Sequence, residues 1–182
     1  MNALIVNCSP VRDGATAEIA RLIAERLKSA ANVTTVCIDD YDIRFCRGCR
    51  SCHKTGKCAL SDDAELLIHE MDRAERLILV SPSYWGEIPG QFKVFIDRLT
   101  PWSNTHEPHA RLRPGKTGYA VALRTGNGMR ECEKILDSIE HLFGHLEIAC
   151  GGRLGLCGVE GREDVLKRKD EIGRFADRML SS

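Results

Sequence analysis

The fold is decided near the N-terminus, by Ala3-Leu4-Ile5-Val6-Asn7-Cys8 followed directly by Ser9-Pro10-Val11-Arg12-Asp13-Gly14-Ala15-Thr16. The first segment is a short apolar run, which is typical of a strand covered on both faces. The second is rich in turn formers and leads into a helical pattern. Amides at a helix N-terminus, with hydroxyls and an arginine nearby, favour binding of a phosphate group. An ordinary strand–helix turn explains the second segment equally well.

The same alternation of apolar runs and helical stripes continues along the chain. Strands are predicted at Ala3–Cys8, Val33–Ile38, Arg76–Ser81, Thr117–Leu123 and Glu147–Cys157. Apolar residues at helical spacing predict helices around 19–27, 64–71, 92–99, 132–143 and 172–179. Strict alternation predicts a single α/β domain over residues 1–182, a doubly wound, five-stranded parallel sheet of flavodoxin-like order 2-1-3-4-5 with helices on both faces.

The composition restricts the classes of function. Lys plus Arg and Asp plus Glu both number 26, so the formal net charge is zero and no global field favours nucleic acid or a membrane surface. No apolar run approaches the roughly 20 residues of a membrane span. The N-terminus lacks the basic region of a signal peptide, and the chain has nine cysteines. We therefore expect a cytoplasmic protein whose thiols bind metal or do chemistry.

Two further loops follow predicted strands at the edge where such sheets bind ligands, outside the carboxyl ends at the topological switch point. Strand three leads into Ser81-Pro82-Ser83-Tyr84-Trp85-Gly86, whose two aromatic residues offer flat surfaces for a planar ring. Strand four leads into Arg124-Thr125-Gly126-Asn127-Gly128, where glycine permits close backbone approach. Aromatic residues that merely close the sheet edge, and a plain turn, are the alternatives.

A compact run of thiols, Cys46-x2-Cys49-x2-Cys52-x5-Cys58, lies on a stretch with neither helical nor strand pattern. Soft sulfur ligands this close together select an iron–sulfur cluster, zinc or cuprous copper. The five-residue gap and the lack of a second run allow all four thiols to serve one cluster, unlike the bacterial ferredoxin pattern. Unligated or redox-active thiols, a zinc site and a disulfide formed on oxidation remain alternatives.

These segments, with Phe95-Ile96-Asp97-Arg98, resemble the NADPH-dependent FMN reductase family of flavodoxin-like proteins. The cysteine run resembles the cluster motif of the iron–sulfur flavoproteins within that family. The resemblance implies that FMN binds with its phosphate on Ser9, Arg12, Ala15 and Thr16, its ring against Pro82, Ser83, Tyr84, Trp85 and Gly86, and a third contact at Thr125 and Gly126. Ala15 stands where the family often carries Asn, so that contact depends on the backbone amide.

The resemblance implies an FMN-dependent oxidoreductase or electron-transfer flavoprotein. A [4Fe-4S] cluster on Cys46, Cys49, Cys52 and Cys58 would exchange electrons with FMN and with a partner such as ferredoxin. The alternative is a cluster-free NAD(P)H-dependent FMN or quinone reductase with small-molecule donors and acceptors. A non-catalytic FMN carrier or thiol redox sensor is the alternative of another class. Because the flavin carries the electron chemistry, no catalytic acid or base is predicted.

The resemblance also implies a homodimer or homotetramer, with the cysteine loop and the segment Pro101–Lys116, a lid or partner surface, at the interface. The other cysteines are expected to be small buried hydrophobes: Cys8, Cys37, Cys150 and Cys157 on strands, and Cys132 on a helix. The pairs His106-x2-His109 and His141-x3-His145 show no evident third ligand and are expected to be solvated.

Overall fold

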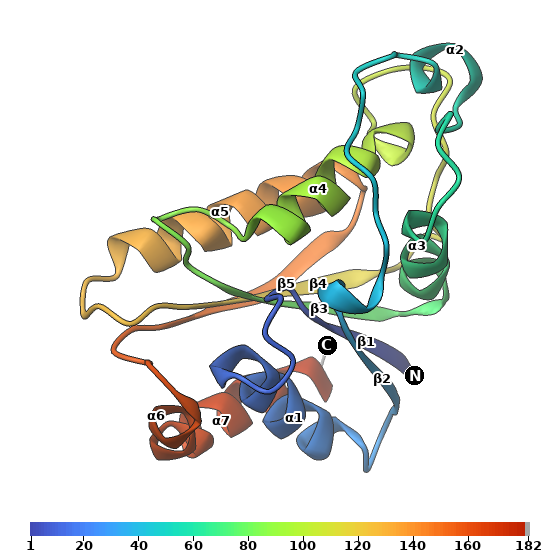
Figure 1. Cartoon of the computed structure of the whole chain (residues 1–182). Helices are drawn as coiled ribbons and strands as arrows, with labels where there is room; N and C mark the ends of the chain where they lie inside the picture. The colour runs from blue at the N-terminus through green and yellow to red at the C-terminus, as the bar shows by residue number, and fades with distance from the viewer. Residues whose placement is uncertain (181–182) are drawn as a thin grey trace.

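The computed structural model describes residues 1–180. Five parallel strands form one sheet in the order β2-β1-β3-β4-β5, as the sequence predicts (Figure 1). The strands are β1 (Asn2–Asn7), β2 (Asn32–Cys37), β3 (Arg76–Pro82), β4 (Thr117–Leu123) and β5 (Ala149–Leu156). The helices are α1 (Ala15–Leu27), α2 (Cys52–Thr55), α3 (Ala64–Arg73), α4 (Gly90–Arg98), α5 (Arg130–His145), α6 (Arg162–Lys167) and α7 (Lys169–Leu180), with 3-10 turns at η1 (Ile38–Asp40) and η2 (Thr100–Trp102).

Helices cover both faces of the sheet because the central strands are apolar on both sides. In β3, Leu77 and Leu79 belong to the core beneath α3, α4 and α5, whereas Ile78 and Val80 belong to the core against α1, α6 and α7. Figure 1 shows these two helical layers on opposite sides of the strands. The sequence alternation therefore predicts the architecture, and only the short helices α2 and α6 were not anticipated.

The edge strand β5 is less covered than predicted. The first half of β5 is largely exposed, whereas its last residue is buried. Consequently, the prediction of a buried thiol is wrong for Cys150, which is exposed, while Cys157 lies just beyond the strand and is half-buried. The same prediction is confirmed for Cys8, Cys37 and Cys132.

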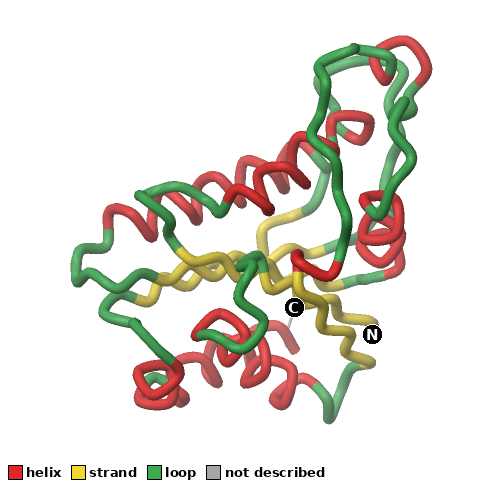
Figure 2. The backbone as a smooth tube through the Cα atoms, in the orientation of Figure 1, coloured by secondary structure: helices red, strands yellow, loops and turns green. Residues whose placement is uncertain are grey.

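Two long connections lie side by side and project away from the sheet, as the loops beyond α3 and α4 in Figures 1 and 2 show. We call them together the arm: the cysteine loop, residues 43–61, and the η2 loop, residues 101–116. They touch where a side chain on Gly56 would meet Pro108, and where the rings of His53 and His106 stack. Within residues 1–180, no helix is both long and apolar enough to cross a membrane.

Candidate flavin site and cysteine arm

Three loops meet at the carboxyl edge of the sheet because β1, β3 and β4 are neighbours there. The amide of Cys8 donates to the carbonyl of Val80 at 2.9 Å, which joins the ends of β1 and β3. The amide of Ser83 donates to the carbonyl of Leu123 at 2.8 Å, which joins the ends of β3 and β4. The segments singled out from the sequence after strands one, three and four therefore lie at one edge of the fold.

The first loop is shaped by Asn7, a buried residue that the sequence reasoning did not single out. Its side-chain nitrogen donates to the carbonyl of Val11 at 3.0 Å, and its side-chain oxygen accepts the amide of Ser9 at 3.1 Å. The hydroxyl oxygen of Ser9 in turn accepts the amide of Val11 at 3.1 Å. These bonds hold the chain in a tight turn before α1. An asparagine at the end of a strand was the available signal.

The N-terminus of α1 points its first amides toward this turn. Gly14 occupies the N-cap position, and within the described residues no side chain caps the helix. The first turn of a helix leaves its amides without backbone partners, so these donors suit an anion such as a phosphate group. Thr16 is buried in the same turn. This arrangement fits the phosphate of a mononucleotide.

Arg12 lies at the rim of the turn, and its guanidinium is already engaged. It pairs with the carboxylate of Asp40 and donates to the backbone carbonyl of Asp39 at 2.8 Å. Asp39 and Asp40 both belong to η1, at the end of β2. The charge of Arg12 is therefore paired at the rim, while the first amides of α1 have no side-chain cap among the described residues.

The second loop is a tight two-residue turn that presents Trp85 to solvent. Tyr84 and Glu87 exchange two backbone hydrogen bonds, of 2.8 and 3.0 Å, while Trp85 and Gly86 between them have φ of 55° and 74°. Positive φ at both central residues defines a type I′ turn. A tryptophan in the left-handed region costs about 1–2 kcal/mol. The indole is fully exposed, so burial within the chain does not offset that cost.

Glu131, at the start of α5, connects the second and third loops. One carboxylate oxygen accepts the hydroxyl of Ser83 at 2.8 Å, and the other lies 3.2 Å from the guanidinium of Arg124. Ser83 also accepts the amide of Gly86 at 3.2 Å. The Arg124 guanidinium lies close over Gly126, because an added Cβ there would lie 2.4 Å from it and would require the arginine side chain to shift. The sequence does not predict Glu131 or its contacts with Ser83 and Arg124, since an acidic residue in the first turn of a helix is common.

The cysteine loop brings part of its thiol set together. Burial raises the pKa of Cys52, and the neighbouring thiols of Cys58 and Cys46 raise it further. The amide of Gly48 donates to the sulfur of Cys46 at 3.5 Å. Cys49 is exposed on the same loop, between the positive-φ residues Gly48 and Arg50. All four thiols are free, and as a soft donor set on one loop they fit an iron–sulfur centre.

The cysteine loop is anchored to the body of the protein by Arg98, the last residue of α4. Its guanidinium is buried and lies 2.6 Å from the carboxylate of Asp62. It also donates to the carbonyl of Arg44 at 2.9 Å and to the carbonyl of Leu60 at 3.3 Å. Burial alone would raise the pKa of Asp62, but hydrogen bonds from Arg98 and from the amides of Ala64 and Arg44 lower it to about 2. Arg98 therefore joins both ends of the cysteine loop to α4.

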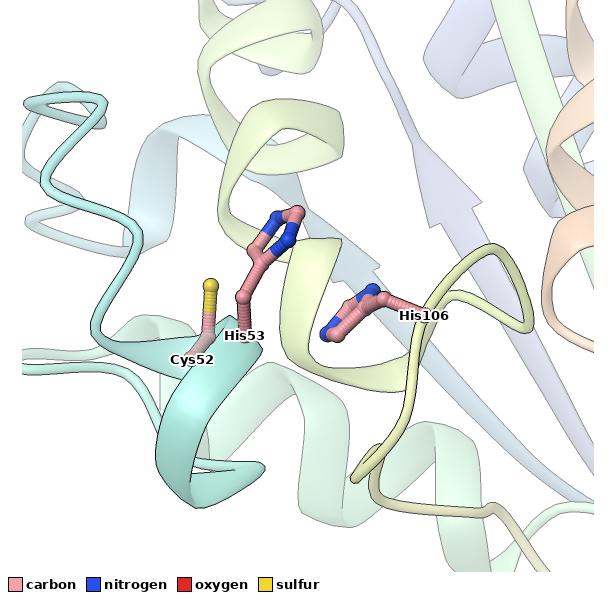
Figure 3. A group of neighbouring side chains, drawn as sticks. All are labelled: Cys52, His53 and His106. Carbon is pink, nitrogen blue, oxygen red and sulfur yellow. The ribbon is translucent and has the colours of Figure 1, made fainter.

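The histidines of the η2 loop correct a prediction. His106 and His109 were expected to be solvated, yet both ring nitrogens of His106 and Nε2 of His109 are buried without a hydrogen-bond partner among the described residues. His106 stacks on His53 with ring centroids 4.1 Å apart (Figure 3). Burial and the neighbouring His53 lower the pKa of His106. The prediction failed because the η2 loop packs against the cysteine loop, a tertiary contact. The other pair, His141 and His145, lies toward solvent as expected.

Comparison with known proteins agrees with this arrangement. The model of the NADPH-dependent FMN reductase family matches residues 1–152. An iron-sulfur flavoprotein of Archaeoglobus fulgidus is 26% identical over 175 residues, covering 95% of this chain and 77% of that protein. An iron-sulfur flavoprotein of Clostridioides difficile is 32% identical over 156 residues, covering 81% of this chain and 67% of that protein.

Solved structures share the fold at low sequence identity. NAD(P)H:quinone oxidoreductase from Methanothermobacter marburgensis superposes with a TM-score of 0.76 at 14% identity, covering all of this chain and 98% of that one. An FMN-dependent NADH-azoreductase from Bacillus anthracis, in complex with FMN, superposes with a TM-score of 0.72 at 14% identity, covering 98% and 99% of the two chains.

The sheet order and the loops at its carboxyl edge define the class of flavodoxin-like domains. Within that class, the chain belongs to the NADPH-dependent FMN reductase family. It is accordingly a flavin-dependent oxidoreductase with FMN as its cofactor.

Proposed function

We propose that this protein is an electron-transfer oxidoreductase that binds FMN across the loops after β1, β3 and β4 and carries a [4Fe-4S] cluster on the arm. The observation that carries the flavin site is the uncapped N-terminus of α1 beside the turn of Ser9 to Thr16. When bound, FMN supplies hydride and single-electron chemistry. The protein's own residues bind and orient it.

The phosphate end of FMN is assigned to Ser9, Arg12, Thr16 and the backbone amide of Ala15. The α1 amides donate along the helix axis, where the macrodipole favours an anion. Arg12 contributes charge from the rim, where Asp39 and Asp40 hold it. The absence of a Gly-x-Gly-x-x-Gly pattern favours a mononucleotide over a dinucleotide at this turn.

The ring end is assigned to the segment from Pro82 to Gly86, with a third contact at Thr125 and Gly126. The type I′ turn exposes both a planar indole and the Tyr84 ring at the sheet edge. Glu131 holds Ser83 and Arg124 in place across the two loops. We expect this link to keep the ring site open to a donor nucleotide or an acceptor.

The cluster is assigned to Cys46, Cys49, Cys52 and Cys58. In its support, two curated relatives are named iron-sulfur flavoproteins, and the four thiols are free and lie on one loop. A cluster on the arm lets a two-electron flavin exchange electrons with a one-electron partner such as ferredoxin. NAD(P)H is the proposed small-molecule donor, and the assembly is proposed to be a homodimer or homotetramer in a reducing cytoplasm.

A second candidate is a cluster-free NAD(P)H-dependent FMN or quinone reductase. The exposure of Cys46 and Cys49 favours it, because two of the four thiols are open to solvent. In this candidate the cysteines remain thiols, and FMN passes electrons directly to a quinone or free flavin. A non-catalytic flavin carrier or thiol sensor would bind FMN but would not turn over.

Anaerobic purification followed by absorption spectroscopy, iron and sulfide analysis and NAD(P)H turnover tests these assignments together. We expect one FMN per chain, about four irons per chain after reconstitution with iron and sulfide, and steady turnover with an acceptor. Cys49→Ser should remove the iron and leave the FMN. Turnover without iron uptake supports the reductase, whereas bound FMN without turnover supports the carrier or sensor.

A further inference from the structure

The arm holds a second set of metal-binding groups that the iron–sulfur assignment does not use. The sulfur of Cys52 and one ring nitrogen each from His53 and His106 all lie within 4.8 Å of one another. Figure 3 shows that Cys52 and His53 extend from α2, while His106 approaches from the η2 loop. The group therefore spans both loops of the arm.

The two ring nitrogens of His106, in a side chain that is itself half-buried, are the independent sign that a ligand belongs here. Both of its ring nitrogens are buried without a hydrogen-bond partner among the described residues, although an unsatisfied buried polar group is destabilising. The Nδ1 of His109 lies 2.9 Å from the backbone carbonyl of His106, which fixes the backbone that carries this ring. A metal ion bound to His106 would satisfy one of the two nitrogens and explain why the ring is held inward.

The donor set selects the metal. One thiolate and two neutral imidazoles with an open fourth position are the ligands of catalytic and labile zinc sites. Zinc bonds of about 2.0–2.3 Å place neighbouring ligand atoms roughly 3.3–3.8 Å apart in a tetrahedron. The present separations are within 4.8 Å, so small side-chain rotations bring the three groups onto one ion. The stacked rings of His53 and His106 must turn out of their 11° alignment to do so.

We propose that Cys52, His53 and His106 bind a zinc ion when the arm carries no iron–sulfur cluster, with water in the fourth position. Cys52 belongs to both sets, so zinc binding and cluster assembly exclude one another at that thiolate. The competition rests on the cluster proposed above, whereas the zinc site stands without it. The arm would then exist in two metal states that use different ligands around one shared cysteine.

The test measures zinc affinity of the full-length, chelator-treated protein by competition with a chromophoric chelator, with cobalt(II) as a spectroscopic probe of thiolate ligation. Flavin absorption is recorded separately for every variant, so loss of FMN is not mistaken for loss of metal. We expect one zinc per chain. His106→Ala and His53→Ala should each weaken binding at least tenfold. His53 is exposed, so its variant stays folded even if His106→Ala does not.

Matched variants separate this site from one made of four cysteines. Cys46→Ser and Cys49→Ser should keep wild-type zinc affinity while losing iron uptake, and His141→Ala, at the exposed pair on α5, should change neither. Zinc added before reconstitution should lower iron uptake by the wild type but not by His106→Ala. Absence of zinc binding, or zinc binding lost in Cys46→Ser and kept in both histidine variants, would overturn the site. Full iron uptake by a protein that retains its zinc would overturn the proposed competition between zinc and the cluster for Cys52.

Discussion

Arg98 and Asp62 form a buried ion pair 2.6 Å long between residues 36 positions apart, and this pair joins the end of the cysteine loop to α4. A buried guanidinium is costly unless every donor is used. Here Asp62 and the carbonyls of Arg44 and Leu60 use them, apart from Nε. The pair therefore determines where the thiols lie relative to the sheet.

Removing the guanidinium should destabilise the protein strongly. Arg98→Met leaves the Asp62 carboxylate buried without its partner, and breaking such a pair typically costs about 3–5 kcal/mol. Urea unfolding followed by circular dichroism measures the change. Arg73→Met is the control, because Arg73 pairs with Glu70 at the surface at 3.7 Å and should cost less than about 1 kcal/mol. Equal effects of the two variants would show that Arg98 does not anchor the loop.

The same pair predicts a dependence on pH. The pKa of Asp62 is about 2 in the folded protein, below the roughly 3.9 of an unfolded chain. Ionised Asp62 therefore stabilises the fold above pH 4 by roughly 2–3 kcal/mol, and this contribution is lost as the pH falls toward 2. The difference in unfolding free energy between wild type and Asp62→Asn should shrink over that window. Parallel stability curves for the two proteins from pH 6 to pH 2.5 would contradict the assignment.

Flavin affinity should depend on Thr16 more than on Arg12. Thr16 lies in the first turn of α1, whereas Arg12 is held at the rim by Asp39 and Asp40. Hydrogen bonds to charged groups contribute about 1.5–3 kcal/mol, so Thr16→Ala should weaken FMN binding roughly ten- to hundredfold. Arg12→Ala should weaken it less than tenfold. Fluorescence titration with FMN measures both variants. A larger loss in Arg12→Ala would mean that the phosphate draws Arg12 away from its carboxylates.

Trp85 is expected to contribute to FMN binding while lowering the stability of the folded protein. Its indole is fully exposed and its backbone is in the left-handed region, which asparagine tolerates better. Trp85→Asn should therefore leave the melting temperature unchanged or slightly raised while weakening FMN binding several-fold. FMN should also quench the wild-type tryptophan fluorescence much more than that of the variant, which retains only Trp102. Equal FMN affinity and equal quenching in the two proteins would place the ring away from this turn.

The sheet was predictable because its signals are local. Both ends of the strand Thr117–Leu123 were predicted correctly, since a run of seven mostly apolar residues bounded by turn signals is typical of a strand. The one-turn helix at Cys52 was missed because four residues do not complete a helical pattern. The burial of His106 was missed because it depends on two loops meeting in space. Glu131 joins segments distant in sequence, for which residue patterns carry no signal, whereas the position of Asn7 at the end of a strand is itself a signal.

The exclusion of residues 44–61 of the cysteine loop from both apolar cores has an evolutionary consequence. In the described part of the chain, no residue from 44 to 61 belongs to either core. Substitutions, insertions or loss of thiols in this segment therefore leave the hydrophobic stabilisation of the sheet intact. A lineage with this architecture can acquire or discard a metal centre through changes in one loop, while selection keeps the flavin edge unchanged.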